Sequence, residues 1–282
     1  MPGTLYVVAT PIGNLADITL RALSILKEVD LIAAEDTRVT HNLLQHYGID
    51  TPSTPYHQHS LGRKAQMLLD MLRSGKDIAL VSDAGTPGIS DPGHEIIALA
   101  IADGIPIVTI PGPNAIITAL VASGLSTKRF AFDGFPPRRT GERRSFFDSL
   151  KDEHRTMVFY ESPHRLLPTL KGMLASWGDR QIAVVREATK MFEEVHRGTV
   201  SSAIERFAAV KAKGEITIVA AGVISRVVET PPDQIREALR ASLASGKSER
   251  DAVREVAAEH PMPKKEVYRI MLEMKGEPTG EK

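Results

Sequence analysis

The sequence DIALVSDAGTPGISDPG, from Asp77 to Gly93, decides the fold because an apolar run passes into a loop of turn-forming residues. Asp77–Val81 predicts a buried strand, and an apolar-periodic helix is expected from His94. The three glycines, two prolines and two aspartates between them permit unusual backbone angles and close approach of a ligand. In open α/β sheets such loops lie at the carboxyl ends of strands, where ligands bind. The spacing matches neither G-x-G-x-x-G nor a P-loop, and the plainer alternative is a tight loop without a ligand.

Two further apolar runs end in turns of the same character. Leu5–Ala9 runs into TPIGN at Thr10–Asn14, and Ile107–Ile110 runs into PGPNA at Pro111–Ala115. A strand that is apolar throughout is typical of a sheet covered on both faces. We therefore expect three glycine- and proline-bearing turns to line one crevice, where backbone groups contact a small molecule.

The order of expected elements predicts an α/β protein with three parts. Apolar strands alternate with helices up to a boundary near 124–135, which predicts a mostly parallel sheet with helices on both faces. Fewer helices separate the strands that follow, which favours a second domain with a mixed sheet. Three short helices are expected from Pro231 onward. The domains are placed at residues 1–124, 125–228 and 229–282. Strands are expected at Leu5–Ala9, Val29–Ala34, Ile78–Val81, Ile107–Ile110, Phe130–Asp133, Thr156–Tyr160, Ile182–Arg186, Glu194–Gly198 and Glu215–Ala221.

Composition excludes several classes of protein. The chain of 282 residues is 42% hydrophobic and 25% charged, as is typical of soluble globular proteins. No apolar run approaches the roughly 20 residues that span a bilayer. The segment MPGTLYVVATPIG lacks the features of a signal peptide, so we expect a cytoplasmic protein without a membrane partner. The absence of cysteine excludes disulfides and thiolate zinc sites.

Charge is unevenly distributed although the formal net charge is zero. The segment Lys128–Arg144 carries six lysines and arginines against Asp133 and Glu142, and it contains Phe130, Phe132 and Phe135. Cations that bind phosphate together with aromatic rings that stack on bases are typical of an RNA-facing surface. The alternative is a solvated segment between domains whose phenylalanines belong to the core.

Six motifs in order carry a resemblance to a known family. They are TPIGNLADIT at 10–19, AAEDTR at 33–38, SDAGTPGISDPG at 82–93, PGPNAIITAL at 111–120, FYESPHRL at 159–166 and REATKMFEEVHRG at 186–198. Between about Leu5 and Gly222 the chain resembles the tetrapyrrole (class III) methylases, in the bacterial branch that 2'-O-methylates small-subunit ribosomal RNA. AAEDTR and FYESPHRL separate this branch from the porphyrin and precorrin methylases.

The resemblance implies a fold, a cofactor and a substrate. It implies two α/β domains with a cofactor cleft between them, followed by the small C-terminal helical segment. S-adenosylmethionine is the implied methyl donor, and no metal is needed. The implied acceptor is the ribose 2'-hydroxyl of a cytidine in the decoding region of 16S rRNA, presented as rRNA or as the small ribosomal subunit. A homodimer is also implied.

The resemblance places the cofactor between two groups of residues. The first-domain group is Pro11, Asp83, Ala84, Gly85, Thr86, Ile89, Ser90 and Ala115. The second-domain group is Tyr160, Glu161 and Thr217.

Charged residues that end two of the strands are candidates for catalysis. Methyl transfer to a hydroxyl requires alignment and loss of the hydroxyl proton, which a carboxylate or a deprotonated lysine accepts. Glu35 and Asp36 follow one strand, and Glu187 and Lys190 follow another. The alternative is that these residues form ion pairs that hold their loops.

Six arginines are predicted to bind RNA, because the guanidinium group suits bidentate contact with phosphate. They are Arg38, Arg138, Arg139, Arg143, Arg144 and Arg165.

Four further interpretations arise from the sequence. His57 and His59 form an H-x-H pair, but the loop around them holds no acidic residue, so a metal site is disfavoured. A tetrapyrrole C-methyltransferase would need a less basic acceptor cleft, and a non-catalytic ribosome-assembly factor would not need the Ser82–Gly93 loop. The C-terminal helices have the spacing of a helix-turn-helix, and Lys264 and Lys265 lie on a basic face, but such tails often only pack on a neighbour.

Overall fold

The computed structural model describes residues 1–57, 61–210, 212–223, 231–260 and 262–276. The chain forms two compact units, Met1–Val223 and Ile224–Lys282. The first unit contains both sheets, and the second contains the C-terminal helices. The division of the first unit at residue 124 stays a prediction.

The first sheet has five parallel strands in the order β3-β2-β4-β1-β5. They are β1 Leu5–Val8, β2 Leu31–Ala34, β3 Ser53–Pro55, β4 Ile78–Val81 and β5 Ile107–Ile110. β1 lies in register with its two neighbours, since Leu5 is opposite both Ile78 and Ile107. Because all five strands are parallel, the loops after β1, β2, β4 and β5 emerge at one edge of the sheet.

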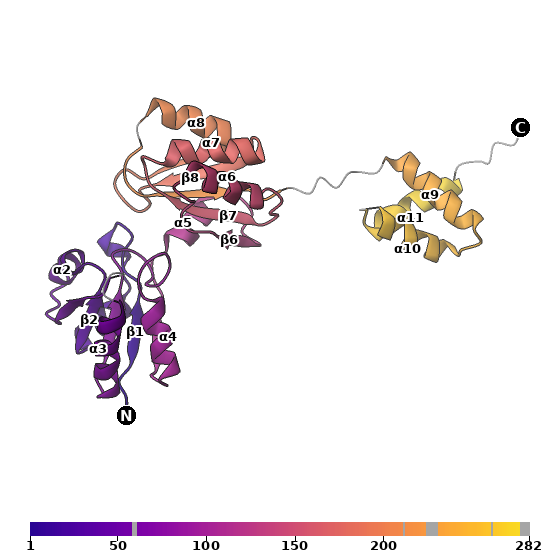
Figure 1. Cartoon of the computed structure of the whole chain (residues 1–282). Helices are drawn as coiled ribbons and strands as arrows, with labels where there is room; N and C mark the ends of the chain where they lie inside the picture. The colour runs from indigo at the N-terminus through magenta and orange to yellow at the C-terminus, as the bar shows by residue number, and fades with distance from the viewer. Residues whose placement is uncertain (58–60, 211, 224–230, 261, 277–282) are drawn as a thin grey trace, which may run out of the picture. The chain divides into compact units, whose positions relative to one another are not determined.

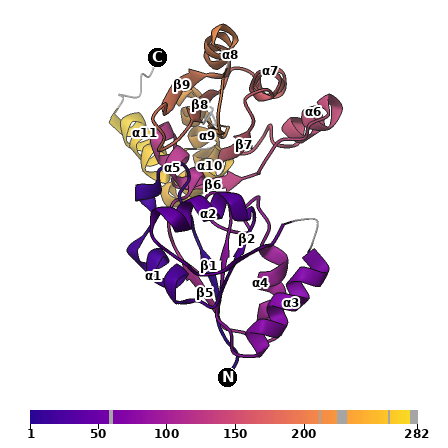
Figure 2. The same ribbon diagram turned by 90° about the vertical axis from the view of Figure 1, so that its left-hand side faces the viewer.

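Helices cover both faces of this sheet, as predicted. They are α1 Leu20–Glu28, α2 Thr37–His46, α3 Leu61–Arg73 and α4 His94–Ala102, with a 3₁₀ turn at Leu15–Asp17. Figure 2 shows α1 on one side of β1 and β5, with α3 and α4 on the other. The core on the α1 side contains Leu26 and Leu43, and the core on the other side contains Leu68 and Ile96. The alternating strands and helices therefore fold as the apolar pattern indicated.

The second sheet is mixed and has the order β6-β7-β10-β8-β9. Its strands are β6 Phe130–Phe132, β7 Thr156–Glu161, β8 Gln181–Arg186, β9 Glu194–Thr199 and β10 Ile216–Ala220. Only the pair β6 and β7 is parallel. Helices α6 Thr140–Ser149, α7 Leu166–Trp177 and α8 Val200–Ala209 pack on one face around a core that contains Phe147 and Phe159. The predicted mixed sheet is confirmed.

Helix α5, Ala115–Ser123, covers the other face of the second sheet (Figure 1). We expected this helix to complete the first domain, because it follows β5. Its buried side chains Ile116 and Leu120 pack instead against Val158 and Val219. The apolar pattern predicted the helix but gave no information on which sheet it covers.

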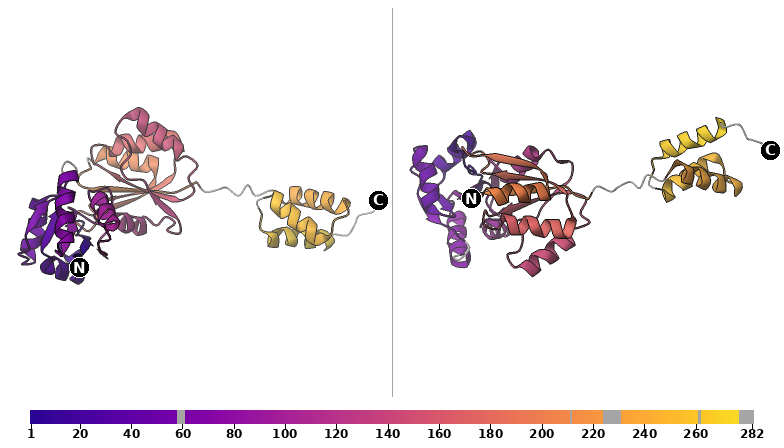
Figure 3. Two further views of the ribbon diagram at one scale, coloured as in Figure 1. Left: turned by 60° about the horizontal axis from the view of Figure 1, so that its bottom comes forward. Right: turned by 90° about the horizontal axis from the view of Figure 1, so that it is seen from above.

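The C-terminal unit is a bundle of three helices, visible in both views of Figure 3. They are α9 Pro232–Ala244, α10 Glu249–Glu259 and α11 Lys264–Gly276. Ile235, Val256 and Ile270 belong to its core, and Ser248 caps α10 by accepting the amide of Asp251. No helix in the described part of the chain is both long and apolar enough to cross a membrane.

Candidate functional site

The loops after β1 and β4 are fastened to each other at the carboxyl edge of the first sheet. The amide of Thr10 donates to the carbonyl of Gly85 at 2.9 Å, and the amide of Gly85 donates back at 3.1 Å. The Thr10 hydroxyl also donates to the carbonyl of Ser82 at 3.0 Å. Gly85 has φ of +83°, where a side chain is disfavoured, so this turn depends on glycine. The Ser82–Gly93 loop is therefore held in one conformation against the loop after β1.

A pocket of about 420 Å³ opens beside these loops. Its volume lies within the range of small-molecule sites. One wall comes from the loops after β2, β4 and β5, and the other comes from β7, β10 and the residues that flank them. The lining residues are Ile12, Glu35, Asp83, Ala84, Gly85, Thr86, Ile89, Ser90, Asp91, Asn114, Ala115, Phe135, Tyr160, Glu161, Ser162, Pro163, Gly214, Glu215, Ile216 and Thr217.

Of the eleven residues predicted to bind the cofactor, all except Pro11 line this pocket. Pro11 is buried beside it, next to Ile12. The pocket also contains residues that sequence reasoning missed. Asp91 belongs to the Ser82–Gly93 loop, so its place in that motif was a sequence signal for the site. Gly214 and Glu215 belong to none of the six sequence motifs. What these residues bind stays a prediction.

Three carboxylates lie on the first-sheet side of the pocket. The Asp36 amide donates to Asp83 Oδ1 at 3.0 Å, and the Asp83 amide donates to Glu35 Oε2 at 3.2 Å, which joins the loops after β2 and β4. Burial raises the pKa of both Glu35 and Asp83. Burial, followed by the charges of Glu35 and Asp83, raises the pKa of Asp91 to about 7. The pocket is thus acidic and suits a cationic ligand.

The opposite wall is held by a buried carboxylate. Glu161 at the end of β7 accepts hydrogen bonds from the Ser162 amide at 2.8 Å and from the Thr169 hydroxyl. Arg165 Nε lies 3.5 Å from Glu161 Oε1, and its Nη2 donates to the carbonyl of Pro136. The Arg165 side chain, predicted to grip phosphate, is only 16% exposed. It positions Glu161 and the loop after β6.

Lys190 and Glu187 form an ion pair next to the pocket, which was the alternative left open by the sequence. Lys190 Nζ lies 2.9 Å from Glu187 Oε1 and 3.2 Å from Glu215 Oε2. Burial lowers the pKa of Lys190, but the hydrogen bond to Glu187 and the charge of Glu215 outweigh it and raise the pKa. Burial raises the pKa of Glu187, and hydrogen bonds from Lys190 and the Glu215 amide outweigh it and lower the pKa. Both shifts oppose proton acceptance near neutral pH.

The other predicted RNA-binding arginines have different surroundings. Arg38 is exposed and pairs with Asp36 at 2.6 Å, and hydrogen bonds from Arg38 lower the pKa of Asp36 to about 2. Arg143 is only 8% exposed, and its Nη1 donates to the carbonyl of Arg138 at 3.0 Å. Its guanidinium therefore supports α6 and does not face solvent. The remaining arginines of this group, Arg138, Arg139 and Arg144, are exposed.

The histidine pair gives no metal site that the structure describes. His59 lies outside the described residues, and no group of three or more potential ligands is arranged for a metal within them.

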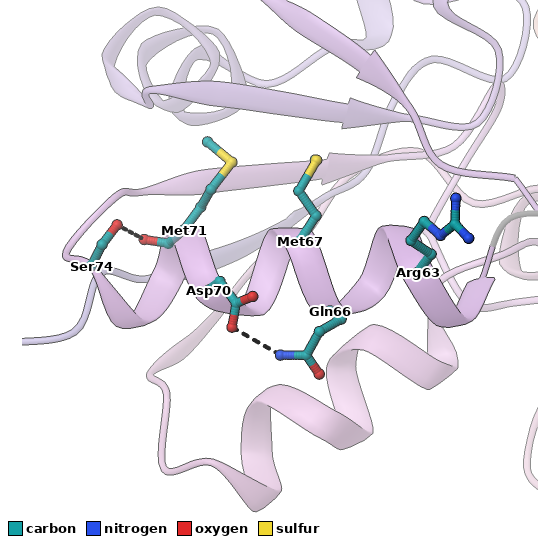
Figure 4. A pocket seen from close by; sticks show the side chains of 6 residues that line it. All are labelled: Arg63, Gln66, Met67, Asp70, Met71 and Ser74. Atoms are coloured by element: carbon teal, nitrogen blue, oxygen red, sulfur yellow. Dashed lines mark hydrogen bonds between the residues drawn. The ribbon is translucent and has the colours of Figure 1, made fainter.

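A second hollow lies along α3 and differs in kind (Figure 4). The residues that line it belong to α3 and to Ser74, which follows it, and they include Met67 and Met71. Gln66 Nε2 donates a hydrogen bond of 2.8 Å to Asp70 Oδ1 within this lining. Among the described residues that line it, Asp70 is the one carboxylate and none belongs to a strand-end loop, unlike the pocket beside β4. The carboxyl edge of the first sheet is therefore the candidate site.

Comparison with known proteins places this site in a family. Residues 4–204 match the family of tetrapyrrole (corrin/porphyrin) methylases. A ribosomal RNA small subunit methyltransferase I from Synechocystis sp. is 45% identical over 98% of this chain and 99% of its own length. One from Bacillus subtilis is 44% identical over 94% of this chain and 93% of its own length.

A solved structure shares the fold at lower sequence identity. A cobalt precorrin-4 methyltransferase of cobalamin biosynthesis is 21% identical and superposes with a TM-score of 0.60. The match covers 77% of this chain and 94% of that protein. The predicted fold class is confirmed, and the chain belongs to the tetrapyrrole (corrin/porphyrin) methylase family, with close similarity to the ribosomal RNA small subunit methyltransferases I.

Proposed function

We propose that this methyltransferase transfers the methyl group of S-adenosylmethionine to the ribose 2'-oxygen of a cytidine in the decoding region of 16S rRNA. The single observation that carries the proposal is the acidic pocket at the carboxyl edge of the first sheet. The names of the relatives, which are 43–45% identical, support rRNA as the substrate. The resemblance of the sequence motifs supports the 2'-oxygen of a cytidine as the methyl acceptor.

The pocket residues fit the proposed cofactor in charge and in shape. Asp83 and Asp91 supply negative charge that favours a ligand with a positive sulfonium and a positive ammonium group. Gly85 and Ala115 allow the backbone of two loops to approach the ligand closely, and Tyr160 offers an aromatic face on the opposite wall. When bound, S-adenosylmethionine would supply a methyl group activated by its positive sulfonium, and transfer to the ribose oxygen would release S-adenosylhomocysteine.

We propose Glu35 as the group that accepts the 2'-hydroxyl proton. Among the four candidates, Asp36 and Glu187 have lowered pKa values and Lys190 has a raised one, so each is a weak base at neutral pH or is already protonated. Glu35 lines the pocket, and burial raises its pKa toward the neutral range in which general bases work best.

The exposed arginines are the proposed contacts for rRNA phosphates. Arg139 and Arg144 lie on α6 and its N-cap, and α6 follows the loop that brings Phe135 to the pocket wall. Phe135 is exposed and its ring centroid lies 5.6 Å from that of Tyr160. A basic surface that adjoins the site would guide the RNA strand toward it.

We also propose a homodimer. Exposed apolar side chains include Leu99 and Ile101 on α4 and Ile117 and Val121 on α5. Exposed apolar side chains that form contiguous patches often mark subunit contacts. Light scattering of the full chain should give twice the monomer mass, and Val121→Arg with Ile101→Arg should give the monomer. A wild-type monomer at assay concentration would contradict the proposal.

The proposed activity is tested by transfer of a labelled methyl group to small ribosomal subunits and to naked 16S rRNA. Label should appear as 2'-O-methylcytidine in the decoding region, mapped by nuclease digestion. Glu35→Gln should lower kcat by roughly 10²–10⁴ at pH 7 with part of the loss recovered at higher pH, while the affinity for S-adenosylmethionine stays within a few-fold. Label on a base, or on an added tetrapyrrole and not on RNA, would refute the proposal.

A further inference from the structure

The loop from Glu187 to Glu193, between β8 and β9, presents two large apolar side chains to solvent. Met191 is 89% exposed and Phe192 is 69% exposed. Phe192 is the most exposed phenylalanine that the structure describes. Burying a side chain of this size contributes about 1.5–3 kcal/mol relative to leaving it in water. Stability therefore does not account for their position at the tip of the loop.

The backbone of this loop is fixed in an unusual conformation. Glu187 and Thr189 have φ of 52° and 67°, which is costly for residues other than glycine and requires support from the surroundings. The amide of Glu187 donates to the carbonyl of Glu215 at 2.9 Å, and the amide of Thr189 donates to the Glu193 carboxylate at 2.6 Å. The backbone that carries the two apolar side chains is therefore held in one conformation before any partner binds.

Lys190 fastens the loop to the rim of the pocket. Its side chain crosses Gly13 so closely that a Cβ atom there would lie 2.5 Å from Lys190 Cγ. Its ammonium group pairs with Glu215, which lines the pocket, as does Ile12 beside Gly13. Met191 and Phe192 follow Lys190 directly, so the backbone that carries them lies near the rim of the pocket.

We propose that Phe192 and Met191 form a stacking surface for a nucleobase of the rRNA strand whose ribose enters the pocket. The inference rests on the proposed function and adds how the acceptor strand is held. A nucleotide within folded RNA has to leave its neighbours in the stack to reach an enzyme pocket, which leaves base faces exposed. Aromatic side chains compensate by stacking on those faces, and they do so without strong sequence preference.

A second copy of this chain fits the loop less well than RNA does. A stable protein interface buries about 800 Å² per partner, whereas one aromatic side chain buries about 150–250 Å². The two side chains at the tip supply far less than that, but they match the face of a single base. Exposed apolar side chains on α4 and α5 offer a protein partner additional area outside this loop.

The first test measures methyl transfer to small ribosomal subunits by Phe192→Ala and Phe192→Trp. The alanine variant should raise KM for the subunits roughly 5- to 100-fold, which corresponds to the loss of one stacked base. The tryptophan variant should keep KM near the wild-type value. The dissociation constant of S-adenosylmethionine should stay within about twofold in both. Leu20→Ala removes an apolar side chain that is 87% exposed, more than Phe192, from the start of α1 and serves as the control.

The second test uses the tryptophan of Phe192→Trp as a reporter. The chain has a single native tryptophan, Trp177, whose indole donates to the carbonyl of Phe147, so its signal is a constant background. Small ribosomal subunits and single-stranded oligocytidylate should quench the new fluorescence, as stacking on a base does. Leu20→Trp should show no quenching.

The outcomes separate this inference from the proposed function. A wild type that forms no 2'-O-methylcytidine refutes the proposed function. A wild type that does so, together with wild-type KM for Phe192→Ala or no quenching of Phe192→Trp, overturns the stacking surface alone. A change of Phe192→Ala from dimer to monomer in light scattering also overturns it, because the occupant would then be a second copy.

Discussion

Asp91→Asn should weaken S-adenosylmethionine binding while making the ligand-free protein more stable. Asp91 lines the pocket with Glu35 and Asp83, and burial and these two charges raise its pKa to about 7. A raised pKa means that the folded state holds its proton more tightly than the unfolded state, so stability is lost as the pH rises from the ordinary carboxyl value of 3.8 to about 7, and the loss is complete above that range. Asparagine keeps the neutral form at every pH. At pH 8 the variant should therefore unfold at a higher temperature than the wild type.

The cofactor reverses the sign of this effect, because a cationic ligand favours ionised Asp91. About a tenth of the Asp91 carboxyls are ionised at pH 6 and about nine tenths at pH 8, if the pKa in the ligand-free protein is about 7. The dissociation constant of S-adenosylmethionine should therefore fall roughly tenfold between these pH values, and binding should release protons at pH 7. Asp91→Asn removes the favourable charge, which should weaken binding at pH 8 by roughly 30-fold or more.

Isothermal titration calorimetry at pH 6, 7 and 8 measures both quantities, and two buffers with different ionisation enthalpies reveal the released protons. Thermal unfolding followed by circular dichroism gives the stability of the ligand-free proteins. Asp17→Asn, which removes an exposed carboxylate from the turn before α1, should change neither. A dissociation constant that is flat in pH for the wild type, or tight binding by Asp91→Asn, would refute the reasoning.

Three further predictions concern the loops and the surface. Gly85→Val should abolish S-adenosylmethionine binding in calorimetry, because φ of +83° is strained for valine, while Gly48→Val, with φ of +60° and no atom near its Cβ, should cost stability alone. Arg139→Ala with Arg144→Ala should weaken RNA binding in filter assays and lower its salt dependence by about two counterions, with cofactor affinity unchanged. Lys190→Met should destabilise the fold by about 1–2 kcal/mol in urea, since Glu187 loses its partner, but keep the pH profile of kcat. An unchanged salt dependence of RNA binding in the double arginine variant would contradict the second prediction. Loss of the pH dependence of kcat in Lys190→Met would contradict the third.

The apolar runs predicted the strands well because burial on both faces leaves a strong signal. Ile78–Val81 and Ile107–Ile110 are strands with the predicted bounds. Ser53–Pro55 is not among the strands expected from the sequence, yet it forms the edge strand β3. Its side chains are polar or proline, and Ser53 and Pro55 are exposed, so it carries neither an apolar run nor an alternating one. An edge strand of this kind is defined by its backbone pairing with β2, which single-residue preferences do not encode.

The charged residues of the site were predicted less well, because their role depends on neighbours distant in the sequence. Arg143 and Arg165 are of the residue type that binds RNA phosphates. The packing of α6 and α7 nevertheless directs both guanidinium groups to backbone carbonyls. Asp91 stands in the most distinctive motif of the chain. Its raised pKa follows first from burial and then from the charges of Glu35 after β2 and Asp83 after β4, residues that only the order of strands in the sheet brings together.

The net charge of zero gives no reason to doubt an RNA substrate, because opposite charges serve different ligands in this fold. A cationic cofactor suits the acidic pocket, where burial and neighbouring carboxylates raise the pKa of Glu35, Asp83 and Asp91. An anionic RNA strand requires cations outside that pocket, and Arg139 and Arg144 are exposed on and beside α6. Counterion release depends on the cations that contact phosphate and not on the sum over the chain. The 35 acidic and 35 basic residues therefore cancel in the total but not at either surface. It follows that salt should weaken RNA binding strongly while acid weakens cofactor binding, and the two dependences should be separable by mutation.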